Sequence, residues 1–450
     1  MSIRHLAVLF MLGNAIYFSM ENASAQNTAS TPATAADKAE APAASTGLIA
    51  YLKRTVQLTG SARARLESTQ GANFSTTPAE AYLLSRIRLG IGFKPFSWFR
   101  SYVEAQDARA YNYKVTPPSS VDDPFDLRQA YVEVGAVEGN GVKIRAGRQD
   151  VTLGSGRLVG TSDWSNTAKN YDVIRGYVTT GSFKMDVLGG SQVLIDPTRL
   201  DRSKPGEHFY GAYATFSKIL PGGSVEPYLF TKTALNVTGK DKILGNADTI
   251  YVGGRVIGQV RGGFDYTYEG VREGGSYADD SVKAWGYVGG GGWTIPNVGW
   301  KLHLNSDYLY GSGDSGKKDG VHESFDNLYG LNQPLNSLTG LFSWRNAEQW
   351  RAGVDFVPYK KLKVKIDFRD YWLATVRDGL YNSSGTRTVL NAKATSNHIG
   401  DGVDALFSYA LSPKSTFVLG IGNLSPGPYL KESGKTSGYI YPTFSFSRQL

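Results

Sequence analysis

The sequence predicts an all-β fold, a transmembrane antiparallel up-and-down β-barrel of about eighteen strands. Two observations lead to this class. An apolar segment near the N-terminus is typical of an exported protein. From about residue 53 onward, short strands follow one another, and their connections alternate strictly between short and long. Outer-membrane barrels have this asymmetry, because their periplasmic turns are short and their outer loops are long.

The N-terminal segment is the first element. Arg4 and His5 precede an apolar run over residues 6–20, and Ala23-Ser24-Ala25 follows as a small-residue cleavage pattern. This order predicts a secretory signal peptide over residues 1–25, because the apolar run is shorter than the ~20 residues that a spanning helix needs. No later stretch is apolar enough for such a helix, so a spanning chain must be a barrel.

Residues 26–46 are rich in Ala, Thr, Ser and Pro, and they are expected to form a flexible linker. Residues 47–450 are assigned to the outer-membrane β-barrel. We expect eighteen strands there, with approximate cores at 54–67, 81–93, 97–107, 126–136, 142–151, 170–178, 182–192, 208–218, 224–234, 248–257, 260–269, 281–293, 299–310, 347–357, 361–373, 399–411, 414–423 and 437–450.

Alternation with a period of two assigns the faces of these strands. Apolar residues from Leu362 to Trp372 alternate with Lys363, Lys365, Asp367 and Arg369. A charge facing mid-bilayer lipid costs ~2–4 kcal/mol for Arg or Lys, so the charged face should line the lumen. A soluble barrel with that face in water is the alternative, and the signal peptide and the connection lengths argue against it.

The composition limits the ligand. Lys and Arg number 48 against 40 Asp and Glu, which gives a net charge of +8. The basic residues are spread over many segments, whereas nucleic-acid binding needs a clustered patch. They favour an anionic ligand if they converge on an interior. Cysteine is absent, which excludes disulfides and cysteine-based metal sites.

The densest polar stretch is GRQDVTLGSGRLVGTSDWSNTAKNYD, residues 147–172. Its arginines suit two-point binding of carboxylates, and Trp164 could stack on a sugar ring. The alternative is a surface loop whose ion pairs are internal. Together with the inward charges, this stretch gives the residues predicted to line the pore and bind substrate: Arg65, Arg86, Arg88, Arg100, Glu104, Lys143, Arg145, Arg148, Arg157, Asp163, Asn166, Lys363, Lys365, Asp367 and Arg369.

Residues 147–172 resemble the signature segment of the alginate export porin family, and residues 324–340 and 397–409 lie where that family has further segments. The resemblance extends over about residues 55–450. It implies an eighteen-stranded barrel in the bacterial outer membrane with an Arg/Lys-lined conduit, and the best-known members secrete the polyuronate alginate. Residues 324–340 and the final Leu450 depart from the family pattern.

The leading functional prediction is a passive channel that exports an anionic, alginate-like polysaccharide. It would act as a monomer in outer-membrane lipid, and a periplasmic export partner could feed it. One alternative is a porin that takes up small anions or short acidic sugars. Others are a hydrolase or lyase on a barrel scaffold, and an adhesin on a plugged barrel. The longest connection, about residues 311–346, could fold inward as a constriction.

No enzyme, cofactor or metal centre is predicted. The five histidines form no HExxH or comparable metal-ligand spacing. The acidic pairs Asp122-Asp123 and Asp279-Asp280 are expected in solvated outer loops, with weak Ca²⁺ binding as the alternative.

Overall fold

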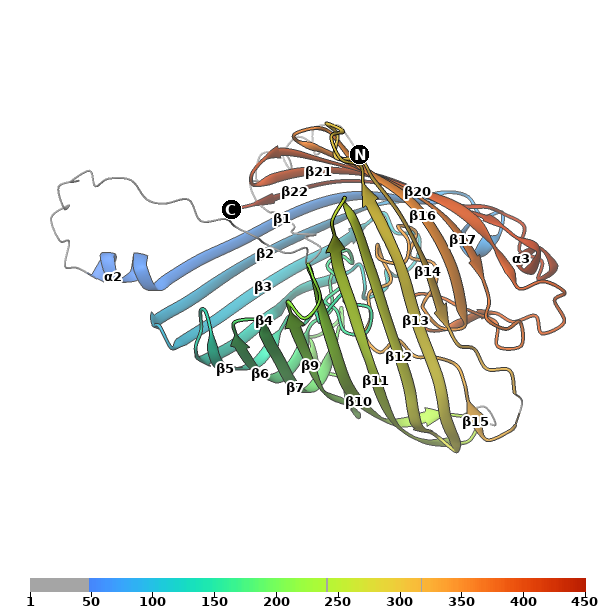
Figure 1. Cartoon of the computed structure of the whole chain (residues 1–450), viewed down its shortest axis with the longest axis horizontal. Helices are drawn as coiled ribbons and strands as arrows, with labels where there is room; N and C mark the ends of the chain where they lie inside the picture. The colour runs from blue at the N-terminus through green and yellow to red at the C-terminus, as the bar shows by residue number, and fades with distance from the viewer. Residues whose placement is uncertain (1–47, 240–241, 317) are drawn as a thin grey trace.

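A computed structural model describes residues 48–239, 242–316 and 318–450. The predicted signal peptide and linker lie outside this part of the chain. Within it, eighteen strands of nine or more residues pair antiparallel with their neighbours, and the pairing of β1 with β22 closes the sheet into a barrel (Figure 1). The predicted fold class is confirmed, and each of the eighteen expected strands has its counterpart.

The barrel strands are, in chain order, β1 Val56–Thr69, β2 Glu80–Phe96, β3 Phe99–Tyr111, β4 Asp123–Gly135, β5 Gly141–Gln149, β6 Tyr171–Thr180, β7 Phe183–Leu194, β9 Glu207–Ser217, β10 Gly223–Thr238, β11 Leu244–Val260, β12 Phe264–Tyr277, β13 Asp280–Thr294, β14 His303–Gly311, β16 Ala347–Tyr359, β17 Leu362–Trp372, β20 His398–Ser412, β21 Ser415–Pro426 and β22 Tyr439–Gln449.

Short elements lie at the two ends of the barrel. The helix α2 (Leu48–Thr55) precedes β1 at the end where the chain terminates, and α3 (Pro428–Glu432) lies at the opposite end (Figure 1). The remaining short elements are η1 Ala72–Phe74, β8 Arg202–Ser203, β15 Val321–His322, β18 Leu380–Tyr381 and β19 Arg387–Val389. None of the described helices is both long and apolar enough to pass through a bilayer.

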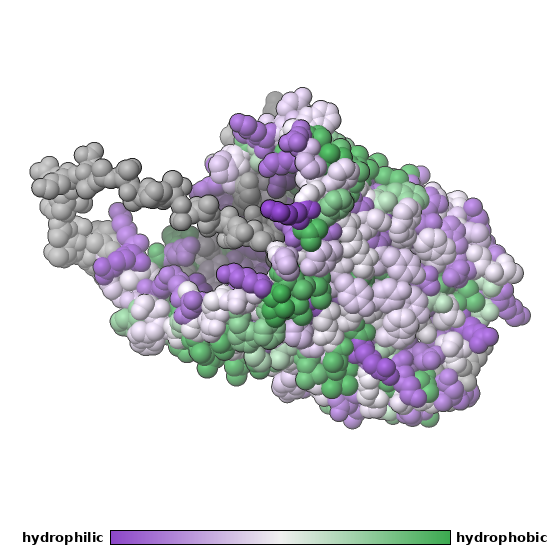
Figure 2. Space-filling view, in the orientation of Figure 1, coloured by the Kyte–Doolittle hydropathy of each residue, from purple (hydrophilic) through white to green (hydrophobic). Residues whose placement is uncertain are grey.

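The predicted assignment of faces agrees with burial. On β2, the apolar Ile87, Leu89 and Ile91 are 52%, 59% and 57% exposed on the outer wall, whereas Arg86, which precedes Ile87, is 3% exposed. Hydrophobic side chains gather on the wall formed by β5 to β9 (Figure 2). Because this apolar surface remains exposed after folding, acyl chains are the environment that suits it.

The prediction that short and long connections alternate strictly is wrong at one place. The strand expected at 260–269 extends as β12 to Tyr277, and only Ala278 and Asp279 separate it from β13. Within the added part of the strand, Glu273 faces inward, is 2% exposed and accepts a hydrogen bond of 3.0 Å from the Tyr251 hydroxyl. The four strands β10 to β13 have 14–17 residues each, more than the ~9–11 that cross a membrane.

The hydrophobic core lies inside the barrel. Val151, Leu158 and Val159 of the β5–β6 connection join Phe325, Tyr329 and Trp344 of the β14–β16 connection, and both groups pack against inward-facing side chains of β6 to β14. A second cluster surrounds Leu338, Tyr371 and Tyr429. The lumen is therefore partly filled by the chain's own loops, and those loops shape the candidate site.

Candidate functional site in the barrel lumen

Two long connections meet inside the barrel. We call residues 150–170, between β5 and β6, inner loop 1, and residues 312–346, between β14 and β16, inner loop 2. The backbone N–H of Tyr329 donates to the carbonyl of Leu158 at 2.9 Å, and that of Leu331 donates to Gly156 at 2.9 Å. A parallel bridge joins Val159 and Tyr329. The predicted inward fold of the longest connection is therefore confirmed.

Side chains reinforce this junction. The Lys169 ammonium donates to the carbonyls of Tyr329 and Gly330 at 3.2 and 3.1 Å, and the Arg157 guanidinium donates to the Asn336 amide oxygen at 2.9 Å. Burial lowers the pKa of Lys169 to about 8, and burial also lowers the pKa of Arg157. Both cations act here as connectors between loops.

Inner loop 1 is fastened to β1 and β2 through Asp163. The Arg86 guanidinium binds both carboxylate oxygens of Asp163 at 3.0 Å, and Arg88 adds a contact of 2.8 Å. Burial alone would raise the pKa of the Asp163 carboxyl, but Arg86, Arg88 and their neighbours outweigh it and hold that pKa well below its ordinary value. Arg65 completes the attachment by donating to the Trp164 carbonyl at 2.6 Å and lying over the Trp164 ring.

Asn166 is a second attachment point of inner loop 1. Its side chain is fully buried, and its amide nitrogen donates to the carbonyls of Ser85 and Val121 at 3.0 and 2.9 Å. Its amide oxygen accepts from Arg63 at 3.2 Å. Asn166 therefore uses both its donor and its acceptor within the protein.

Inner loop 2 is held from both sides of the lumen. On one side, Asp326 pairs with Lys232 of β10 at 3.1 Å, and the Tyr329 hydroxyl donates to Glu207 of β9 at 3.0 Å. On the other side, the Leu338 N–H donates to Asp404 of β20 at 2.9 Å. The loop thus crosses the interior from β9 and β10 to β20.

Arg369 is buried and supports the attachment of inner loop 2 to Asp404. It pairs with Asp367 at 2.8 Å and with Asp404 at 2.9 Å, and it also donates to the Asn336 carbonyl. Arg148, near the end of β5, donates two hydrogen bonds of 2.9 and 3.1 Å to the Asp172 carboxylate.

The fifteen predicted site residues therefore divide into two groups. Those near the long connections are engaged in internal ion pairs or hydrogen bonds that position the inner loops: Arg65, Arg86, Arg88, Arg148, Arg157, Asp163, Asn166, Asp367 and Arg369. The others lie nearer the short turns: Arg100, Glu104, Lys143, Arg145, Lys363 and Lys365.

Two members of the second group, Arg100 and Arg145, belong to a continuous set of charges, which we call the basic row: Arg100, Glu133, Arg145 and Arg175. These four residues are direct cross-strand partners on β3, β4, β5 and β6. Glu133 accepts from Arg100 at 2.8 Å and from Arg145 at 2.6 Å, and Arg175 pairs with Asp186 of β7 at 2.7 Å. Lys143, two residues before Arg145, is the neighbouring cation on the same face.

Aromatic rings accompany the basic row. The Arg145 guanidinium lies 4.3 Å from the Tyr131 ring centroid, and Arg175 lies 4.3 Å from that of Tyr177. The Lys143 ammonium lies 4.9 Å from the Tyr177 centroid. Guanidinium forks beside tyrosine rings offer an acidic sugar both a carboxylate partner and a stacking face.

Sequence reasoning missed Glu133, Arg175, Tyr131 and Tyr177. The signal that could have found them is register: pairing β5 with β4 and β6 places Glu133 and Arg175 on either side of Arg145, and Tyr177 beside Lys143. On the other side of the lumen, Lys363 and Lys365 follow the β16–β17 turn and are exposed, with Lys365 3.6 Å from Asp367.

The fold is that of known outer-membrane porins. Pseudomonas aeruginosa OpdQ aligns with a TM-score of 0.58 at 11% identity, covering 89% of this chain and 98% of OpdQ. OccK8 (OprE) of the same organism gives 0.57 at 10% identity, covering 88% and 98%. OccK2 (OpdF), whose structure is a complex with glucuronate, gives 0.56 at 10%, covering 88% and 96%. At such identities the likeness shows the fold alone.

No curated protein sequence matches the chain. A family model does match: the model described as alginate export aligns with residues 54–441, which include all of the strands from β2 to β21. Its span agrees with the extent of the resemblance in the sequence, and the barrel places the protein in the bacterial outer membrane. The chain belongs to the alginate export family of outer-membrane β-barrel proteins.

Proposed function

We propose that this protein is a passive outer-membrane channel that exports an anionic, alginate-like polysaccharide. The observation that carries the proposal is the basic row with its tyrosines. Arg100, Arg145, Arg175 and Lys143 are four cations against the two carboxylates of Glu133 and Asp186, so this wall keeps a positive excess. A polyuronate presents a carboxylate on each sugar ring. The cations of this wall offer a partner for the carboxylate, and the tyrosine rings offer a stacking face for the sugar ring.

The position of the cations near the short turns supports outward transport. The basic row, Lys363 and Lys365 lie toward the short turns, which face the periplasm in barrels of this kind. An exported polymer would meet these cations first, before it reaches the inner loops. Glu133 and Asp186 moderate the attraction, and conduction needs binding that is strong enough to admit the polymer and weak enough to release it.

The uptake of short acidic sugars is a second candidate. The inner loops fill much of the lumen toward the long connections, which favours a small cargo over a chain that must slide. The OccK2 barrel, which was solved with glucuronate, shares the fold. A barrel-scaffold enzyme has less support, because the family and the structural neighbours are channel proteins.

Conductance in planar bilayers tests the leading proposal. With a salt gradient across the bilayer, the reversal potential should indicate a preference for anions. Polyuronate added on the short-turn side should block the current, and longer chains should block at lower concentration because they engage more cations. A cation preference, or no block at any chain length, would contradict the proposal.

Liposome swelling separates the two candidates. An export channel should admit uronate oligomers and show little advantage for the monomer. Rapid entry of the monomer with complete exclusion of oligomers would instead favour the uptake porin.

A further inference from the structure

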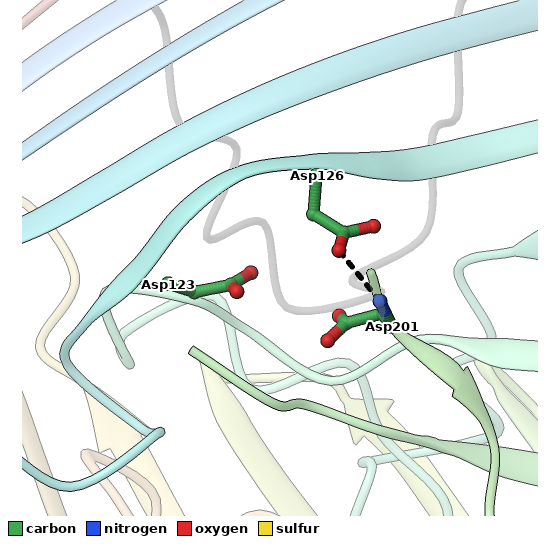
Figure 3. Close-up of side chains that lie close together, drawn as sticks. All are labelled: Asp123, Asp126 and Asp201. Atoms are coloured by element: carbon green, nitrogen blue, oxygen red, sulfur yellow. Dashed lines mark hydrogen bonds between the residues drawn. The ribbon is translucent and has the colours of Figure 1, made fainter. Parts of the chain in front are cut away.

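Three carboxylates converge near the long-loop end of the barrel, where β4 begins. The side chains of Asp123 and Asp126 from β4 and Asp201 from the β7–β9 connection each place a carboxylate oxygen within 4.8 Å of the other two. Asp123 and Asp126 are 2% and 3% exposed. The three carboxyl groups point toward a common space (Figure 3). In the described part of the chain, this is the one such group of potential metal ligands.

A β-bulge brings two of these residues to the same face. Residues three apart in a regular strand lie on opposite faces. Here Asp123 pairs with Ala108 and Asp126 pairs with Gln106, so β4 uses one residue more than β3 over this interval. The extra residue is accommodated at Phe125, which has φ +27° and leaves its ring 67% exposed on the outer wall.

Asp123 is the unusual member. Its Oδ1 is buried and has no hydrogen-bond partner among the described residues, and none of the ion pairs found in them involves its carboxylate. An isolated buried carboxylate is costly unless it is paired or binds a metal. The two neighbouring carboxylates repel the charge of an ionised Asp123 and do not stabilise it.

The neighbouring cation does not meet this need. Arg148 lies 3.7 Å from Asp126, but its two-point partner is Asp172 at 2.9 Å. Asp126 accepts backbone hydrogen bonds from Leu127 and Asp201, and Asp201 accepts one from Asp196 at 2.8 Å. These contacts orient Asp126 and Asp201 but leave Asp123 without a counter-charge.

We propose that Asp123, Asp126 and Asp201 bind one divalent cation, with Ca²⁺ as the best match. Ca²⁺ prefers oxygen ligands, accepts carboxylates in one- or two-point geometry and tolerates irregular sites. The ion would tie the β7–β9 connection to the start of β4, at the same end of the barrel where β5 ends at Gln149. The sequence predicted that Asp122-Asp123 and Asp279-Asp280 lie in solvated outer loops. This expectation is wrong for Asp123 and Asp280, which are 2% and 5% exposed, whereas Asp122 accepts the Ala110 N–H at 2.8 Å.

Calorimetric titration of the full-length, detergent-purified protein with CaCl₂ after EGTA treatment tests the proposal. The wild type should bind one Ca²⁺ with a Kd no weaker than ~10⁻³ M, the range of extracellular sites. Removal of outer-shell groups already weakens metal binding ~10–100-fold, so Asp123→Asn and Asp201→Asn, which each lose a ligand, should weaken it at least ~10-fold.

Asp279→Asn is the matched control, because it removes the same charge from the other acidic pair, where no third carboxylate joins. Its affinity should equal that of the wild type. A second readout uses thermal unfolding. In EGTA, Asp123→Asn should unfold at a higher temperature than the wild type, because it relieves the repulsion; in saturating Ca²⁺ the order should reverse.

Two results would overturn the proposal. One is that the wild type binds no calcium even at a Ca²⁺ concentration 10-fold above the weakest expected Kd of ~10⁻³ M. The other is that the wild type and the two ligand variants bind Ca²⁺ with equal affinity. Heat-modifiable gel migration establishes that each variant is folded. If Asp123→Asn does not fold, Asp201→Asn decides the question, because Asp201 lies outside the barrel strands.

Discussion

The two halves of the lumen contain the same types of charged residue in different surroundings. Toward the long loops, Arg86 and Arg369 are each 3% exposed and bound to aspartates that hold the inner loops. Toward the short turns, Lys363 and Lys365 are exposed, and the Arg100 side chain is 32% exposed. Charge read from a sequence is therefore not the charge that a substrate meets, because buried arginines are neutralised by their partners.

The largest effect should follow from opening the long-loop half. Replacing residues 328–339 of inner loop 2 with a short Gly-Ser linker removes the contacts with Leu158 and Asp404. Single-channel conductance should rise severalfold, because this segment crosses the lumen. The control is a replacement of the 381–390 segment, which contains β19, with the same kind of Gly-Ser linker. Equal conductance in both variants would show that inner loop 2 does not limit the current.

Breaking the central ion pair of inner loop 1 should cost stability. Asp163→Asn leaves Arg86 and Arg88 without their carboxylate, and removal of one partner from a buried pair costs ~3–5 kcal/mol. The free energy of unfolding in urea measures the loss. Glu138→Gln is the control, because its pair with Lys94 is exposed and should contribute nothing measurable. If the two variants were equally stable, the buried ion pairs of the long-loop half would contribute no more to stability than the exposed pairs near the short turns.

Selectivity should depend on the short-turn half. Replacing Lys143, Lys363 and Lys365 with glutamine should shift the reversal potential toward cations and leave stability nearly unchanged, because these lysines are partly or largely exposed. Replacing the turn lysines Lys218, Lys360 and Lys414 with glutamine removes the same charge at the same end. If both triple variants shift selectivity equally, the charge of the lumen wall is not responsible.

The smallest effect concerns Lys169. Its pKa of about 8 lies below the ordinary lysine value, so between about pH 8 and 10.5 the unfolded chain binds more protons than the folded one. The contribution of Lys169 to stability should therefore rise with pH across that window. The difference in unfolding free energy between the wild type and Lys169→Met, measured at pH 7 and pH 10, should change accordingly, and a constant difference would exclude this assignment.

Most of the barrel could be predicted because period-two alternation repeats in each strand. Ile87, Leu89 and Ile91 indicated the outer face of β2 from the sequence alone. At β12 the expected strand ended at residue 269, and the burial of Glu273 against inner loop 2 shows that the strand continues, with Arg272 exposed on its other face.

The site could be predicted less well, because its residues come together through long-range contacts. Asp163 and Arg86 are 77 residues apart, and Arg157 and Asn336 are 179 apart. Alternation gives the face of a residue but not its partner, so it could not separate Arg369, which is bound to Asp404, from Lys363, which is exposed. Strand register would have supplied the basic row, and the bulge at Phe125 hid the carboxylate cluster from any periodic pattern.

The strands β10 to β13, of 14–17 residues each, extend one part of the barrel rim. A two-residue turn, Ala278 and Asp279, joins β12 to β13 at the end of continuous hydrogen-bond ladders, which makes this part of the rim rigid. In the proposed export, the emerging polymer would pass this rigid rim on one side of its path.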